Sequence, residues 1–297
     1  MKVFSVQNEK GGCGKSTTSI NLAFGLAQKG LRVLAVDNDP QANLTSVVLK
    51  LSKEIKTKEM LKVISMTDTN DMDLDKARNL LHEYVDKTVF KCDVSDVLND
   101  PSVIKDAIIK SSYDNLWVVP SSHKLSESDM KLKNAMRNAD GRLRSALDKV
   151  QNDFDVVIID NSPFENALTY NSISACYREG DTIVIPTKID QGGLEGLDHT
   201  ISTMIEWLEY GDLEYDFKIL CTMVNKNNTD KTVITWLKQL FQNRVFNTCI
   251  HYQAKPVVDA SISKDILINV SKEHVALDYL DFVNEVYNKI TKESRGQ

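Results

Sequence analysis

A short stretch near the N-terminus, rich in glycine and lysine, carries the residues with the clearest chemical use. It spans residues 10–17 and reads KGGCGKST. Its three glycines let backbone N–H groups close around an anion without obstruction from Cβ atoms. The lysine at its sixth position, Lys15, can reach terminal phosphates, and the hydroxyl of Ser16 can ligate Mg²⁺. The stretch is therefore typical of a loop that cradles phosphate groups.

The stretch departs from the usual phosphate-loop pattern G-x-x-x-x-G-K-[ST] at one position. Glu9 stands where a glycine is expected, five residues before Gly14, and a second lysine, Lys10, follows it. An apolar segment, residues 3–6, leads into the stretch and a helical pattern leaves it, which is the order that a phosphate loop needs. The residues alone leave one alternative, a tight turn with two solvated lysines.

Aspartates end two apolar runs that have the length of buried strands. Residues 31–36 run into Asp37-Asn-Asp39, and the run that starts at Phe154 ends in Asp160. Open parallel sheets bind ligands at the carboxyl ends of their strands. An aspartate at such a place typically holds Mg²⁺ through a bound water, because this hard cation keeps several of its waters. The alternative for each carboxylate is a helix cap or a turn residue.

Hydrophobic periodicity predicts alternating strands and helices along most of the chain. Helices are expected at residues 15–29, ended by Gly30, at 127–150 and at 274–293. Strands are expected at residues 31–36, 116–119, 154–160, 182–186 and 218–224, with a short one around Val245. Residues 50–92 interrupt this pattern and are interpreted as a helical insertion with a loop inside it. We therefore predict an α/β fold, with a doubly wound, mostly parallel sheet covered by helices on both faces, as one domain over residues 1–297.

Composition sets limits on the class of protein. A chain of 297 residues, 42% of them hydrophobic, can bury a sizeable core. It contains no apolar run long enough for a membrane span and no signal peptide, so a cytoplasmic protein is expected. Five cysteines without a C-x-x-C pair indicate reduced thiols rather than disulfides or a zinc site. The formal charge of −6 argues against a surface that binds nucleic acid all over.

The glycine-rich stretch, with its additional lysine, resembles the deviant Walker A loop KGGxGK[ST] of the ParA/MinD family of P-loop ATPases. Further segments are similar to that family: VLAVDNDPQANLT, DNSPFENALTYNSISA, TKIDQGGLEGL and YLDFVNEVYNKI. The resemblance runs from residue 2 to about residue 290, apart from the insertion. Two positions differ from the family pattern, because Ser162 replaces a proline and Asp190 stands where glutamate is usual.

The resemblance implies ATP and Mg²⁺ as cofactors and a role for each site residue. Nucleotide contacts are expected from Gly11, Gly12, Cys13, Gly14, Lys15, Ser16 and Thr17, with Cys13 as a small filler residue. Ser16, Asp39 and Asp160 would bind the Mg²⁺ ion directly or through its waters. Asp39 would also orient the attacking water, and Asp37 would be mainly structural. Lys10 would reach the phosphates of a partner's nucleotide, so that ATP holds a sandwich dimer together. Asn225 is the candidate adenine contact, although His251 replaces a proline of the family nearby.

The same resemblance implies a DNA-partition ATPase. Such a protein binds DNA non-specifically as an ATP-bound homodimer, associates with the nucleoid, and is released when a ParB-like adaptor stimulates weak ATP hydrolysis. Residues 218–272 hold eight basic and three acidic side chains, a charge of +5, which favours a phosphate-contacting face with Lys255 and Lys264 as candidate DNA contacts.

Three alternatives stay open at this point. A MinD-like ATPase would dock the helix at 274–293 on a membrane, but acidic residues on its polar face favour packing on the protein body instead. A nucleotide-gated binding module that positions protein clusters would bind ATP without turning it over. A nitrogenase-type iron protein would need cysteines in glycine-rich contexts, which Cys92 and Cys176 lack.

Overall fold

The structure is a computed structural model of the chain, and it describes residues 1–51, 90–133, 140–210 and 216–294. These residues form an α/β fold around one sheet of seven strands, in the order β3-β4-β2-β5-β1-β6-β7. The strands are β1 (Lys2–Val6), β2 (Val33–Asn38), β3 (Ile109–Lys110), β4 (Leu116–Val119), β5 (Val156–Asn161), β6 (Thr182–Lys188) and β7 (Asp216–Thr222). All neighbouring strands pair in parallel except β3, which runs antiparallel to β4 at the edge.

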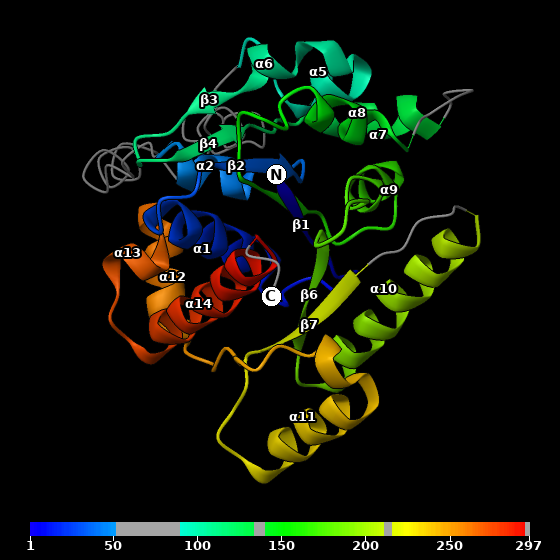
Figure 1. The fold of residues 1–297 in the computed structure, drawn as a ribbon. Helices are drawn as coiled ribbons and strands as arrows, with labels where there is room; N and C mark the ends of the chain where they lie inside the picture. The colour runs from blue at the N-terminus through cyan, green and yellow to red at the C-terminus, as the bar shows by residue number, and fades with distance from the viewer. Residues whose placement is uncertain (52–89, 134–139, 211–215, 295–297) are drawn as a thin grey trace, which may run out of the picture.

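Helices cover both faces of the sheet, as predicted (Figure 1). One face carries α1 (Lys15–Gln28), α2 (Asn43–Val48), α12 (Ala254–Ser263), α13 (Leu267–Val270) and α14 (His274–Ser294). The other carries α5 (Val94–Asn99), α7 (Leu125–Lys133), α8 (Arg142–Asp148), α9 (Ala167–Ser174), α10 (Gln191–Tyr210) and α11 (Asn228–Phe241). The short α6 (Ile104–Ala107) and two 3₁₀ turns, Pro101–Val103 and Gln242–Arg244, complete the described elements.

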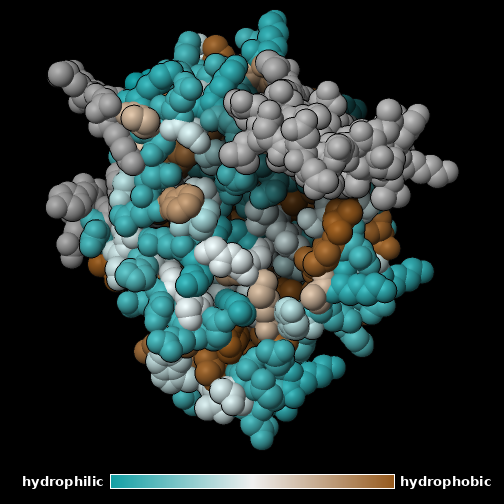
Figure 2. All heavy atoms as spheres, turned by 180° about the vertical axis from the view of Figure 1, so that it is seen from behind, coloured by the Kyte–Doolittle hydropathy of each residue, from teal (hydrophilic) through white to brown (hydrophobic). Residues whose placement is uncertain are grey.

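Both faces of the sheet are buried, which explains why the strands read as continuous apolar runs. In β5, Val156 and Ile158 pack under the α1 layer while Val157 and Ile159 face the opposite layer. Seen from behind, the surface is mainly hydrophilic with small separate groups of apolar side chains (Figure 2). The apolar residues therefore lie chiefly in two cores, one on each side of the sheet.

The predicted strands are present, with small shifts in their limits. The last one begins and ends two residues earlier than expected, and Val245 forms only an isolated bridge with Ile219. Sequence patterns missed β3, because a strand of two residues has no periodicity to detect. The helix at residues 15–29 is confirmed, and Gly30 follows it with a φ of 87°, a conformation that ends helices.

The prediction of one helix over residues 127–150 is wrong. A separate helix, α8, begins at Arg142 after a bend at Asp140 and Gly141. Its first N–H groups are satisfied from another helix, because Asn171 Oδ1 of α9 accepts from the N–H groups of Arg142 and Leu143 at 3.0 and 3.1 Å. A helix start that is capped from across the fold leaves no local signal. The predicted insertion at residues 50–92 lies almost entirely outside the described residues.

The last helix packs on the protein body, as expected. The buried face of α14 contains Ala276, Tyr279, Phe282, Val283, Val286 and Ile290, which lie against α1 and the sheet. Within the described residues, no helix is long and apolar enough to cross a membrane.

Candidate nucleotide site

Two side chains of the loop between β1 and α1 donate to the same backbone oxygen, the carbonyl of Lys10. The ammonium group of Lys15 donates to the carbonyl of Lys10 at 2.9 Å, and the thiol of Cys13 donates to the same oxygen at 3.3 Å. Gly12 and Gly14 have φ angles of 75° and 91°, which side chains disfavour. From β7, the Thr222 hydroxyl donates to the Cys13 carbonyl at 2.9 Å and fixes the loop to the sheet.

Asp160 lies at the end of β5 beside the first turn of α1. Its Oδ1 accepts from the Ser19 hydroxyl at 2.8 Å, whereas its buried Oδ2 has no hydrogen-bond partner among the described residues. Burial raises the pKa of Asp160, although the nearby hydroxyls of Ser16 and Ser19 lower it. A buried carboxylate oxygen without a partner, next to the hydroxyl of Ser16, fits a site for a hard cation such as Mg²⁺.

The other two acids have different surroundings. Asp37 is fully buried, and its Oδ2 accepts from the backbone N–H and the hydroxyl of Thr45 at 2.7 and 2.6 Å. Burial, followed by the charge of Asp160, raises the pKa of Asp37. These contacts fit the expected structural role, because they fasten the start of α2 to the end of β2. Asp39 accepts from the N–H of Gln41 at 2.9 Å and is close enough to Asp160 to raise its pKa.

Lys10 and Lys15 lie in opposite environments although five residues separate them. Lys15 is buried inside the loop, whereas Lys10 is exposed and its side chain lies against the start of α10. A Cβ atom added to Gly192 would lie 3.1 and 3.2 Å from Cε and Nζ of Lys10. At Gly196 an added Cβ would lie 2.7 Å from Cβ of Lys10 and 2.6 Å from Oδ1 of Asn8. The glycines of α10 therefore make room for Lys10, a role that the sequence analysis missed.

The candidate adenine contact, Asn225, follows the carboxyl end of β7, just as the phosphate loop follows the carboxyl end of β1. Asn225 follows β7, and its backbone N–H donates to Asp230 Oδ2 at 2.7 Å. His251 is brought next to it by a parallel bridge to Val224 and is fixed by Asp278, with Nδ1 and Oδ2 at 3.0 Å. The structure thus brings Asn225 and His251 together.

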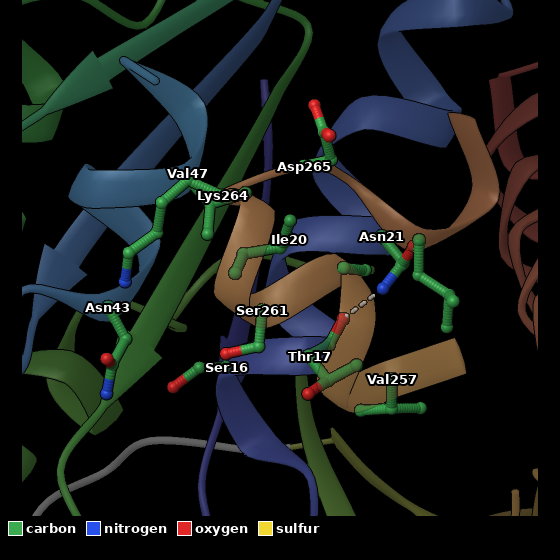
Figure 3. A pocket seen from close by; sticks show the side chains of 12 residues that line it. Ser16, Thr17, Ile20, Asn21, Asn43, Val47, Val257, Ser261, Lys264 and Asp265 are labelled. Atoms are coloured by element: carbon green, nitrogen blue, oxygen red, sulfur yellow. Dashed lines mark hydrogen bonds between the residues drawn. The ribbon is translucent and has the colours of Figure 1, made fainter. Parts of the chain in front are cut away.

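The candidate DNA contacts fall in two different settings. Lys255 is exposed near the start of α12, whereas Lys264 is half-buried at its end, in a pocket shared with Ser16 and Thr17 (Figure 3). Some basic residues of the segment 218–272 lie on α11 and others on α12, and these two helices are well apart in Figure 1. The positive charge of this segment is therefore divided between separate parts of the surface.

The fold and the site together define a class of protein. A parallel sheet whose first strand enters a glycine-rich loop, with acids from neighbouring strands at the same edge, is the architecture of P-loop nucleotide-binding proteins. Residues 1–219 match the model of a family described as AAA domain. The chain is also 30% identical over 287 residues to the sporulation initiation inhibitor protein Soj of Bacillus subtilis, covering 96% of this chain and 98% of Soj. It belongs to the ParA-type family of P-loop partition ATPases.

Other similarities agree with this family. The chromosome partitioning protein ParA of Myxococcus xanthus is 26% identical over 296 residues, which cover 99% of this chain and 90% of that protein. Apo McdA of Cyanothece has a TM-score of 0.73 at 19% identity, covering 97% and 99% of the two chains. A putative plasmid partition protein of Borrelia burgdorferi bound to AMPPNP has a TM-score of 0.69 at 21% identity, covering 98% and 99%. At these identities the two structures support the fold.

Proposed function

We propose that this chain is a DNA-partition ATPase in which ATP controls dimerisation, and dimerisation controls DNA binding. The observation that carries the proposal is the contrast between the two lysines of one loop. Lys15 is buried where it can serve the chain's own nucleotide, while Lys10 is exposed on the outside of the loop, against α10. An exposed lysine beside a phosphate site is suited to contact the nucleotide of a second copy.

The described residues can perform the hydrolysis with modest chemistry. Backbone N–H groups of residues 11–17 and the ammonium group of Lys15 would hold the phosphates. Ser16, Asp39 and Asp160 would hold Mg²⁺, which neutralises charge on the phosphates as the bond to the terminal phosphate breaks. Asp39 would orient the water that attacks. Asp37 takes no direct part, because Thr45 and the N–H of Asp39 occupy its carboxylate.

Dimerisation is tested by light scattering or sedimentation with a non-hydrolysable ATP analogue. We expect a dimer with the analogue and Mg²⁺, and a monomer with ADP, since a ligand shifts an equilibrium only toward the state that it binds more tightly. A monomer at high protein concentration with saturating analogue would contradict the proposal.

DNA binding is tested through Lys255 and the salt dependence of retention on DNA. Each phosphate contact lowers the slope of log K against log salt by about 1, so Lys255→Ala is expected to weaken binding and flatten that slope by about 1. Lys124→Ala is the matched control, because Lys124 is an exposed lysine beside α7 on the opposite face of the sheet. Retention that ignores salt, or equal losses in both variants, would reject the assignment.

Hydrolysis is tested by phosphate release with and without DNA and a ParB-like adaptor. We expect slow release alone and faster release with both. No release under any condition would leave the chain as a nucleotide-gated binding module. The membrane-docking alternative has less support, because the apolar face of α14 is occupied by contacts with α1 and the sheet.

A further inference from the structure

A pocket of about 220 Å³ lies on the flank of the phosphate loop, between α1, α2 and α12 (Figure 3). The first turn of α1 contributes the hydroxyls of Ser16 and Thr17 to its lining. Asn43 at the start of α2 and Ser261 on α12 add further polar groups, and Lys264 lies at the end of α12. The pocket therefore combines two phosphate-loop residues with a lysine about 250 positions away in the sequence.

Lys264 brings a positive charge into this pocket. The side chain of Lys264 extends across it toward Asn43, and no described residue forms an ion pair with Lys264. Asp265 is the acid in the lining, but its carboxylate points away from the other polar groups and pairs with Lys50 at 3.8 Å. The N-terminus of α1, which carries partial positive charge, adds to the charge of Lys264. Such a pocket favours an anion.

Asn21 connects the segment that follows Lys264 to the start of α1. The side-chain amide of Asn21 donates to the carbonyl of Thr17 at 2.7 Å, while its oxygen accepts from the N–H of Ile268 at 3.0 Å. Ile268 lies four residues after Lys264, so this one side chain links the turn that carries Lys264 to the first turns of α1. Lys264 therefore shares the pocket with Thr17, one of the residues expected to contact the nucleotide.

We propose that Lys264 binds the inner phosphates of the nucleotide held by its own chain. This inference rests on the proposed ATP site and adds a third lysine to it, one that approaches from α12 rather than from the loop. It also separates Lys264 from Lys255. Lys264 serves the nucleotide, and Lys255, exposed on the same helix, is left for DNA. Nucleotide binding thereby acts directly on the helix that carries the DNA contact.

Calorimetric titration with Mg²⁺-ATP and with Mg²⁺-ADP tests the inference. Lys264→Gln is expected to weaken both nucleotides about tenfold, the usual loss for a charge-assisted hydrogen bond. Lys264→Arg is expected to stay within about threefold of the natural chain because it keeps the charge. Lys124→Gln is the matched control and should change neither affinity, because Lys124 is an exposed lysine on the opposite face of the sheet. Melting without nucleotide should be alike for all four proteins, because Lys264 forms no ion pair with a described residue.

Several results would overturn the inference. They are unchanged affinities in Lys264→Gln, a loss confined to ATP, an equal loss in Lys264→Arg, or weaker DNA retention with unchanged nucleotide affinity. If the natural chain bound neither nucleotide, both the proposed function and this inference would be rejected. Nucleotide binding by the natural chain with no effect of Lys264→Gln would reject the inference alone.

Discussion

Gly25 of α1 and Val283 of α14 are packed so closely that a Cβ atom on Gly25 would lie 2.5 Å from Cγ2 of Val283. No real Cβ atom tolerates that distance, and both residues are buried. The contact lies in the core on the α1 side of the sheet and holds the helix that begins at the phosphate loop. A glycine in the middle of a helix usually lowers stability, so the close approach of α14 is the reason for this one.

Gly25→Ala should therefore destabilise the protein, although alanine is the better helix former. We expect a net loss of about 1–3 kcal/mol in the free energy of unfolding, because overpacking outweighs the gain of roughly 1 kcal/mol in helix propensity. The free energies of unfolding of the two proteins are measured by chemical denaturation. Gly141→Ala is the control, since no described residue outside its chain neighbours lies within 4 Å of its added Cβ. Adding Val283→Ala should restore part of the loss, and a stabilised Gly25→Ala protein would contradict the packing.

Thr45 is expected to stabilise the fold by its hydrogen bonds to the buried carboxylate of Asp37. Its hydroxyl donates to Asp37 at 2.6 Å and accepts from the N–H of Ser121 at 2.9 Å. Thr45→Val removes both bonds at nearly constant volume, and we expect a loss of about 2–3 kcal/mol in unfolding free energy. Thr45→Ser keeps the hydroxyl and should lose about 1 kcal/mol for the missing methyl group. Equal losses in the two variants would show that the hydroxyl is unimportant.

Tyr279 should make stability depend on pH in the alkaline range. Burial raises its pKa to about 12, although a hydrogen bond with Thr18 lowers it. The unfolded chain has a tyrosine pKa of about 10. The folded state thus prefers the protonated phenol, so this contribution is complete below about pH 10 and is lost as pH rises toward 12. Unfolding free energies measured on both sides of pH 10 should fall less steeply in Tyr279→Phe. Identical slopes would contradict this prediction.

Cys249 should be the most reactive of the five thiols. A hydrogen bond with Cys221 lowers its pKa, opposed by burial and helped by the charge of Lys238, and Cys249 is partly exposed whereas Cys221 is buried. Burial raises the pKa of the thiols of Cys13 and Cys176 instead. Because the thiolate is the reactive form, limited alkylation at neutral pH followed by peptide mass spectrometry should find Cys249 modified first. Cys249→Ser should slow the overall reaction, and prior labelling of Cys13 would refute the assignment.

The two lysines of the loop should separate nucleotide binding from dimerisation. Lys15→Ala is expected to abolish measurable nucleotide binding, because it removes the buried ammonium group of the cradle. Lys10→Ala should keep nucleotide affinity within about threefold, because the side chain of Lys10 is exposed and lies against α10 on the outside of the loop. It should nevertheless stay monomeric with the ATP analogue in light scattering. A Lys10→Ala protein that dimerises normally would place the dimer contact elsewhere.

Much of the fold could be predicted because its signals are local, and signals of the same kind predict the candidate phosphate loop. Apolar runs marked the parallel strands, and the glycines with Lys15 and Ser16 marked the loop. The break before α8 could not be predicted, because Asn171 caps that helix from another part of the chain. The insertion at residues 50–92 is likewise an interpretation of the sequence alone.

The sequence by itself determined the chemistry of this protein: a phosphate loop with two lysines, and aspartates at the ends of two strands. These features depend on residue type and on the order of neighbours along the chain. The tertiary structure decided which lysine is buried and which is exposed, that Asp37 is held by Thr45, and that Lys264 lines one pocket with Ser16 and Thr17. Such relations depend on packing between segments far apart in the chain, which local pattern does not encode.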